Sequence, residues 1–337
     1  MKEAMFYEKA SKDAVRCRLC NHFCLVEEGA RGQCGVRENR QGKLYSMVYG
    51  KIVAAHADPV EKKPLYHFMP GARAFSIGTV GCNFQCEHCQ NSFIAQYPRE
   101  HQGEIIGNEA SPEEIVAGAK SAACAIMAYT YTEPTIFYEF ALDTARLAQG
   151  EGLKNVFVSN GYLSSRATRH MAPFLHGINV DLKSFSDEFY KEVCGARLKP
   201  VLKTIQETKD LGVWVEVTTL VIPGLNDKKR ELREIARFLK ALDPAIPWHV
   251  TAFHPAHRMM DRPPTPRETL LLARDTGLEE GLRHVYMGNL PDGEGQNTCC
   301  SSCGTVVVER RGGESVTKNM ERGRCSACGQ PVAGVWS

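Results

Sequence analysis

The sequence predicts an α/β fold with a parallel β/α core and a cysteine-rich module on either side of it. Three observations lead to this fold class. Short apolar runs rich in β-branched residues alternate with helical patterns over residues 71–288. The 14 cysteines are concentrated in three groups. Residues 1–70 and 289–337 lack the alternation and carry the first and third groups, so we expect three domains with these boundaries.

Six apolar runs in the core are predicted strands: AFSIGTV (74–80), AIMAYTY (125–131), NVFVSN (155–160), INVDL (178–182), VWVEVTTLVI (213–222) and HVTAF (249–253). The clearest helix follows Ser111, with Pro112 at the first helical position and Glu114 closing a capping box. Further helices are predicted over 135–149, 199–210 and 227–242. Six β/α units in series predict a parallel sheet, either open and doubly wound or curved into a full or partial barrel.

The composition excludes several classes of protein. Lys and Arg total 41 against 39 Asp and Glu, a net charge of +2, which disfavours a polyanionic partner such as nucleic acid. The sequence has no 18-residue apolar run and no apolar segment of a signal peptide at its start, so we expect a cytoplasmic protein that does not enter a membrane. In that compartment thiols stay reduced, which favours metal or catalytic roles over disulfides.

The central cysteine group has the spacing Cys82-x3-Cys86-x2-Cys89 and directly follows the first predicted strand. Three thiolates in one loop can hold a [4Fe–4S] cluster and leave the fourth iron without a protein ligand. The alternative is a structural zinc site, which needs a fourth ligand. The adjacent His88 is poorly placed for that role, because it is expected to point away from a metal bound by Cys89.

The C-terminal group consists of two Cys-x2-Cys-Gly knuckles, Cys300/Cys303 and Cys325/Cys328, which predict a zinc ribbon with Cys299 as a spare cysteine. Such a ribbon stabilises a tail too short to build its own core, and recognition of a partner or a nucleic acid is the alternative role. The N-terminal group is Cys17, Cys20, Cys24 and Cys34. Four thiolates suit either zinc or an auxiliary iron–sulfur cluster, and we favour zinc.

The central motif resembles that of the radical S-adenosylmethionine (SAM) enzymes. The resemblance continues at the ends of the later strands, in Thr132-Glu133-Pro134, Ser159-Asn160-Gly161, Asp181-Leu182-Lys183, Val221-Ile222-Pro223-Gly224 and Phe253-His254. The last four segments are similar to those of pyruvate formate-lyase activating enzymes. The resemblance implies a partial (β/α)6 barrel of the TIM type, with the site at the C-terminal ends of its strands.

The resemblance also implies the roles of individual residues. Glu133 is expected to bind the SAM amino group, and the other expected cofactor contacts are Asn160, Asp181, Lys183 and His254. The candidate catalytic residues are Asp181, Lys183 and Cys194. Structural interpretations stand beside these roles: an ion pair between Asp181 and Lys183, a loop histidine at His254 and a buried thiol at Cys194.

Over nearly its whole length the chain is most similar to the radical SAM member of the AmmeMemoRadiSam system, in segments such as RCRLCNHFC, DPVEKKPLYHF and CSACGQPVAGVW. This implies reductive cleavage of SAM at a [4Fe–4S] cluster and hydrogen abstraction from a substrate. The first hypothesis for that substrate is a protein, as for activating enzymes. The second is a small molecule modified together with Memo-like and Ammecr-like proteins. A third hypothesis, from a different class, is that the chain is a zinc-ribbon nucleic-acid-binding protein whose iron–sulfur loop is structural. A reductant such as flavodoxin or ferredoxin is implied as a partner.

Overall fold

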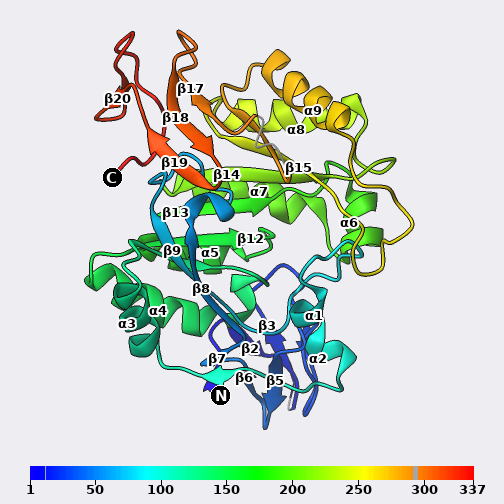
Figure 1. The fold of residues 1–337 in the computed structure, drawn as a ribbon. Helices are drawn as coiled ribbons and strands as arrows, with labels where there is room; N and C mark the ends of the chain where they lie inside the picture. Colours follow the sequence, from blue (N-terminus) through cyan, green and yellow to red (C-terminus); the bar gives the residue numbers. More distant parts are fainter. Residues whose placement is uncertain (12, 291–294) are drawn as a thin grey trace.

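The computed structural model describes residues 1–11, 13–290 and 295–337. Its core is a single eight-stranded sheet in the linear order β16-β15-β14-β13-β12-β11-β9-β8 (Figure 1). The strands are β8 (Ala54–Pro59), β9 (Arg73–Gly78), β11 (Ile126–Tyr129), β12 (Lys154–Ser159), β13 (Gly177–Asp181), β14 (Trp214–Val221), β15 (Trp248–Ala252) and β16 (Val285–Gly288). The seven strands from β9 to β16 in this order are parallel, and β8 pairs antiparallel with β9.

All six predicted core strands are confirmed. Their interiors are apolar because both faces of a parallel sheet are covered, as at β11, where all four residues are buried. The sequence analysis missed two strands of this sheet. β16 is only four residues long, and β8 comes from residues 54–59, which the sequence groups with the N-terminal module. The boundary near residue 70 stays a prediction, as does the boundary near 289, where residues 291–294 of the expected linker lie outside the described residues.

The helices connect the parallel strands and cover the sheet (Figure 1). They are α1 (Ser92–Ala95), α2 (Tyr97–Glu100), α3 (Pro112–Ser121), α4 (Tyr138–Gly150), α5 (Ser165–Met171), α6 (Asp187–Cys194), α7 (Leu198–Asp210), α8 (Lys229–Leu242) and α9 (Arg267–Glu279). Short 3-10 turns occur at η1 (Val60–Lys62), η2 (Pro134–Phe137) and η3 (Ala172–Phe174). None of the helices in the described part of the chain is long and apolar enough to cross a membrane.

The predicted start of α3 is confirmed. The Ser111 hydroxyl accepts a hydrogen bond from the Glu114 amide at 3.2 Å, and the Glu114 carboxylate accepts one from the Ser111 amide at 2.8 Å. This capping box satisfies two amides that a helix start leaves unpaired. α4 begins three residues later than predicted, because Pro134–Phe137 forms the 3-10 turn η2.

The N-terminal segment folds into small antiparallel sheets beside α4 and the loop after β9. One sheet has the order β1-β6-β5 and another β2-β3-β4, while β7 pairs with β10. Their bounds are β1 (Lys2–Glu3), β2 (Tyr7–Lys9), β3 (Val15–Cys17), β4 (Leu25–Val26), β5 (Arg37–Arg40), β6 (Lys43–Ser46), β7 (Lys51–Ile52) and β10 (Asn108–Glu109). Each sheet is too small to be stable alone, so this segment depends on packing against the core.

A buried ion pair ties the N-terminal segment to α4. Arg37 on β5 donates to both carboxylate oxygens of Glu139, at 2.6 and 2.9 Å, and the amide of Met5 donates to the same carboxylate at 2.7 Å. The side chains of Arg37 and Glu139 are only 2% and 1% exposed. Their charges compensate each other inside the protein, and the loss of either would leave an unpaired buried charge.

The C-terminal module lies at the opposite end of the molecule from the N-terminal sheets (Figure 1). It contains β17 (Thr298–Cys299), β18 (Val306–Arg311), β19 (Glu314–Thr317), β20 (Met320–Glu321) and β21 (Arg324–Cys325). Arg310 attaches it to the core by donating to the Tyr66 carbonyl at 2.6 Å, and within the module it donates to the Thr298 hydroxyl at 2.9 Å. Tyr286, at the start of β16, also contacts Thr298 at 2.8 Å. The module therefore docks at the amino-terminal ends of the strands.

We predict that Glu139→Gln destabilises the protein by about 3 kcal/mol or more, because it leaves the Arg37 guanidinium buried without a counter-charge. Urea unfolding followed by circular dichroism measures this loss. The control is Glu151→Gln, which removes one partner of the exposed Lys120–Glu151 pair and is expected to cost under about 0.5 kcal/mol. Equal effects of the two substitutions would contradict the role of the buried pair.

Candidate active site

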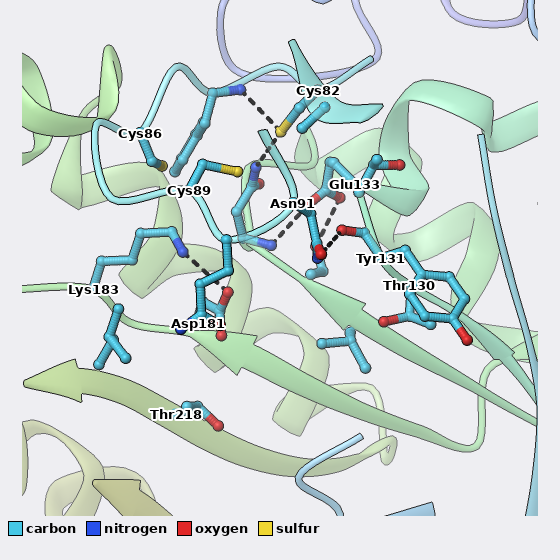
Figure 2. Close-up of a pocket in the computed structure, with 18 of the residues that line it drawn as sticks. Cys82, Cys86, Cys89, Asn91, Thr130, Tyr131, Glu133, Asp181, Lys183 and Thr218 are labelled. Carbon is cyan, nitrogen blue, oxygen red and sulfur yellow. Dashed lines mark hydrogen bonds and ion pairs between the residues drawn. The ribbon is translucent and has the colours of Figure 1, made fainter. Parts of the chain in front are cut away.

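A cavity of about 300 Å³ opens at the carboxyl ends of the parallel strands (Figure 2). The predicted site residues that line it are Cys82, Cys86, Cys89, Glu133, Asn160, Asp181 and Lys183. They come from the ends of β9, β11, β12 and β13 and the loops that follow. Parallel strands end at a common edge of the sheet, so residues up to 101 positions apart in the sequence reach the same cavity.

The loop that carries the three cysteines is held from outside by its backbone carbonyls. Arg99 donates to the carbonyls of Cys82 at 2.8 Å and Phe84 at 3.1 Å. His22, in the N-terminal segment, lies with its Nε2 atom 2.7 Å from the carbonyl oxygen of Asn83 and therefore donates to it. These contacts satisfy three successive carbonyls on the outer side of the loop and fix its conformation.

The other side of the loop rests on the end of α6. The amide of Gln85 donates to the carbonyl of Cys194 at 2.9 Å, and the amide of Glu87 donates to the carbonyl of Val193 at 2.9 Å. The last turn of a helix has carbonyls without intrahelical partners, and here the cysteine loop satisfies two of them. Both sides of the loop are thus set by segments distant in the sequence.

The three cysteines fit an iron–sulfur cluster. All three are free thiols at least partly shielded from solvent, and burial raises the pKa of Cys82 well above its ordinary value and that of Cys89 to about 11. The neighbouring Cys194 thiol and burial raise the pKa of Cys86 in the same way. Thiols so reluctant to ionise become thiolate ligands when a metal supplies the compensating charge. Three such donors facing one cavity suit a cubane with an open iron.

His88 is a site residue that the sequence analysis did not assign. Its side chain is 4% exposed and lines the cavity, and neither ring nitrogen has a hydrogen-bond partner among the described residues. Burial lowers its pKa to about 3, so the ring is neutral. A buried imidazole without a partner is costly unless a bound group supplies one. The His88 ring therefore needs a hydrogen-bond partner from a group bound in the cavity, beside the cysteines.

Glu133 is buried and held in one orientation by the end of β12. One carboxylate oxygen, Oε1, accepts from the Thr135 amide at 3.0 Å and the Ser159 hydroxyl at 2.9 Å, and Thr135 adds its own hydroxyl. Among the described residues, the other oxygen, Oε2, accepts only from the Asn160 amide, at 2.7 Å. Burial raises the pKa of Glu133, and the hydrogen bonds oppose this effect. Oε2 retains capacity for one further donor, such as an ammonium group.

Asn160 links the end of β12 to the cysteine loop. Its side-chain nitrogen donates to the Asn83 side-chain oxygen at 2.7 Å and lies 3.9 Å from the sulfur of Cys82. Its side-chain oxygen accepts from the Tyr162 amide at 3.1 Å. Asn160 thus contacts Glu133 through its backbone amide and the cysteine loop through its side chain. These two contacts fix the position of Glu133 relative to the cysteine loop.

Asp181 and Lys183 form an ion pair at the cavity wall, with 3.0 Å between Nζ and Oδ2 (Figure 2). Burial alone would lower the pKa of Lys183, but the Asp181 carboxylate and the nearby cysteine sulfurs raise it well above its ordinary value. The structural interpretation of an ion pair is therefore correct, and both residues also line the cavity.

The structure places two other candidates elsewhere. Cys194 is fully buried outside the cavity lining, and its carbonyl supports the cysteine loop. His254 has an exposed side chain and does not line the cavity either. The catalytic role of Cys194 and the SAM contact of His254 stay predictions that this geometry does not support.

The loop after β11 has an unusual backbone at Tyr131, where φ is +67°. The carbonyl of Tyr131 accepts a hydrogen bond from the Asn91 side chain at 2.6 Å, and both residues line the cavity (Figure 2). A positive φ is strained for a large side chain, so this contact compensates for a conformation that glycine adopts freely. The sequence analysis did not assign Asn91 or this hydrogen bond, because only the contact between the two residues reveals them.

The ribbon cysteines gather as predicted. The sulfurs of Cys300, Cys303, Cys325 and Cys328 all lie within 4.8 Å of one another, and Cys299 is outside this group. The N-terminal cysteines Cys17, Cys20, Cys24 and Cys34 line a separate cavity of about 20 Å³ next to the active site.

Comparison with known proteins identifies the family. Residues 76–239 match the radical SAM superfamily. The chain belongs to this superfamily. It is 44% identical over 335 residues to the uncharacterized protein MJ0808 of Methanocaldococcus jannaschii, a match that covers 98% of this chain and 99% of that protein.

Two more distant likenesses agree with this assignment. The pyruvate formate-lyase-activating enzyme of Streptococcus mutans is 19% identical over 191 residues, covering 55% of this chain and 72% of that enzyme. The crystal structure of Streptococcus suis SuiB bound to S-adenosylmethionine has a TM-score of 0.52 at 12% identity, covering 72% of this chain and 56% of that chain. The latter shows a shared fold. The superfamily uses a [4Fe–4S] cluster and SAM, for which the cavity described above has suitable donors.

We predict that Gly81→Ala prevents the cysteine loop from packing against the N-terminal segment. At φ +95° an added Cβ would lie 2.6 Å from Val36 Cγ1 and 3.0 Å from the Cys34 carbonyl oxygen. The combined strain and overlap are expected to cost about 1–3 kcal/mol and at least to halve the iron bound after anaerobic reconstitution.

The matched control is Gly212→Ala, because Gly212 has a similar φ of +80° but no atom within 4 Å of the added Cβ. It carries the backbone strain without the overlap and should load iron normally. Full iron loading of Gly81→Ala would contradict the close packing of the cysteine loop on the N-terminal segment.

Proposed function

We propose that this protein is a radical SAM enzyme that cleaves SAM reductively at a [4Fe–4S] cluster and abstracts hydrogen from a substrate, in the manner of an activating enzyme. The observation that carries the proposal is that the three cysteines and Glu133 face the same cavity at the carboxyl ends of a parallel sheet. In this proposal the sheet acts as the partial barrel typical of the superfamily.

Cys82, Cys86 and Cys89 would hold the cluster, and Glu133 would receive the amino group of SAM at its free Oε2 position. When bound, the cluster supplies the electron, and SAM supplies the 5′-deoxyadenosyl group that takes the hydrogen atom. The protein residues position these groups and shield them from solvent. Asn160 keeps the cysteine loop and Glu133 in register, and the cavity walls exclude water from the reacting groups.

Asp181 and Lys183 would orient SAM rather than react. Their ion pair presents both a carboxylate and an ammonium to the cavity, which suits the hydroxyl and carboxylate groups of a nucleoside attached to an amino acid. Because the pair is already formed in the protein, it needs no reorganisation when SAM binds.

A protein substrate is our first candidate. One relative is by name an activating enzyme for pyruvate formate-lyase, which is itself a protein. The strands β17 to β21 of the C-terminal module dock at the amino-terminal ends of the sheet strands, and of the described residues in this module only Asn289 lines the cavity, which leaves the cavity side open to a large partner. A small reductant protein such as flavodoxin or ferredoxin would supply the electron. In the C-terminal module, the four gathered sulfurs would bind structural zinc.

The direct test is anaerobic incubation of the reconstituted protein with SAM and dithionite, with 5′-deoxyadenosine measured by chromatography. We expect 5′-deoxyadenosine from the wild-type protein and from the control Cys299→Ala, and none from the triple variant Cys82→Ala/Cys86→Ala/Cys89→Ala. The absence of 5′-deoxyadenosine from wild-type protein with a full cluster would overturn the proposal.

We predict that Glu133→Gln weakens SAM binding about 10- to 150-fold, because a charged hydrogen bond to a buried group contributes about 1.5–3 kcal/mol. Iron content should not change, since Glu133 is not a cluster ligand in this proposal. Equilibrium dialysis with labelled SAM measures the affinity, and the exposed Glu113→Gln serves as control. An unchanged Kd in Glu133→Gln would show that this carboxylate serves only the fold.

A further inference from the structure

The N-terminal cysteines surround a cavity that the proposed reaction does not use. Cys17 ends β3, Cys20 and Cys24 lie in the turn that leads to β4, and Cys34 comes three residues before β5. All four line one cavity of about 20 Å³, and none of them is in a disulfide. Four free thiols around a common space can bind a zinc ion or an iron–sulfur cluster, which differ in size and in the spacing of their sulfur ligands.

The spacing of the sulfur atoms distinguishes this group from the ribbon. Four sulfurs about 2.3 Å from a zinc ion lie only about 3.8 Å from one another. The ribbon has this close arrangement, and it is the only place in the described residues where three or more ligand atoms of Cys, His, Asp or Glu lie within 4.8 Å of one another. The N-terminal sulfurs are more widely spread. So are the sulfurs of Cys82, Cys86 and Cys89, which belong to the superfamily's cluster motif.

The size of the cavity agrees with the spacing. A zinc site leaves no room for a water-sized sphere of about 1.4 Å radius, because its sulfurs lie only about 2.3 Å from the centre. The N-terminal cavity holds about 20 Å³, more than the roughly 10–15 Å³ that one water needs. The four thiols therefore leave more space between them than sulfurs closed on a single zinc ion would.

Hydrogen-bond donors at this site also suit a cluster bound by four thiolates. Arg37 lines the cavity, and although its charge is paired with Glu139, its Nε atom has no hydrogen-bond partner among the described residues and can donate to a sulfur. The amide of Gln33 lies 3.5 Å from the sulfur of Cys24, as a donor to a thiolate would. Hydrogen bonds and nearby charges of this kind stabilise iron–sulfur clusters and set their potentials.

We propose that Cys17, Cys20, Cys24 and Cys34 bind a second iron–sulfur cluster, which supports the wall of the active site. This reverses the preference for zinc that the sequence alone suggests. The proposal deepens the proposed function but does not depend on SAM chemistry, because it concerns a metal group held by four other cysteines.

Three contacts connect the second site to the first. Thr135 lines the N-terminal cavity and also donates to Glu133. His22 lines the same cavity and donates to the carbonyl of Asn83 in the cysteine loop. Arg99 donates to the carbonyl of Cys82 and also to that of Gln33, which precedes Cys34. The metal group at the N-terminal site therefore holds residues that shape the SAM cavity, and these residues act as positioning residues.

The test uses the full chain in which the first cluster cannot form. The variant Cys82→Ala/Cys86→Ala/Cys89→Ala is reconstituted anaerobically with iron and sulfide, and iron, acid-labile sulfide and zinc are then counted per chain. We expect about two to four irons with matching sulfide and one zinc, together with an iron–sulfur absorption band that dithionite bleaches. Adding Cys20→Ala and Cys24→Ala to this variant should remove the iron and leave the zinc.

Two zinc ions and no iron in the triple variant would overturn the proposal in favour of a second zinc site. A triple variant that binds the ribbon zinc and no other metal would also overturn it. Cys303→Ala in the triple-variant background is the matched control, since it should remove the zinc and leave the iron. Failure here is separable from failure of the proposed function: wild-type protein that cleaves SAM with only four irons would contradict the second cluster alone.

Discussion

The structure depends on one constraint, which is that a short loop must turn three thiols toward a cavity while its carbonyls face the other way. Cys82, Asn83 and Phe84 lie in open backbone, and no helix or strand satisfies their carbonyls. Arg99 and His22 do so from outside, and the end of α6 takes the loop amides on the opposite side. Unsatisfied carbonyls at this depth would favour another loop conformation. The loop geometry is therefore a property of the whole fold.

This constraint explains why the N-terminal segment cannot be separated from the core. The segment supplies His22, packs Val36 against Gly81 and is locked to α4 by the buried pair of Arg37 and Glu139. The C-terminal module does not support the cysteine loop in this way, because it attaches through Arg310 and Tyr286 at the amino-terminal ends of the strands. The two cysteine-rich modules thus differ in position: one supports the cysteine loop from outside the cavity, and the other attaches at the opposite end of the sheet.

The sequence predicts those features that depend on local patterns. Six core strands, the capping box at Ser111 and the four ribbon cysteines follow from periodicity and spacing, and all are found. Features made by contacts between distant segments do not follow from it. Two examples are the ring of His88, whose nitrogens have no hydrogen-bond partner among the described residues, and the hydrogen bond from Asn91 to the strained Tyr131, since each depends on neighbours far along the chain. His254 is a residue whose predicted contact the geometry does not support, because a strand-end position does not fix where a loop side chain points.

The central claim is that the cluster loop and Glu133 share one cavity that brings the open iron and SAM into contact. Electron paramagnetic resonance of the reduced, reconstituted protein tests this claim most directly, with spectra recorded before and after SAM is added. A ligand on the open iron changes the electronic structure of that cluster, so we predict that the signal lost in the Cys82→Ala/Cys86→Ala/Cys89→Ala variant shifts with SAM. A signal from these three cysteines that is identical with and without saturating SAM would contradict the account.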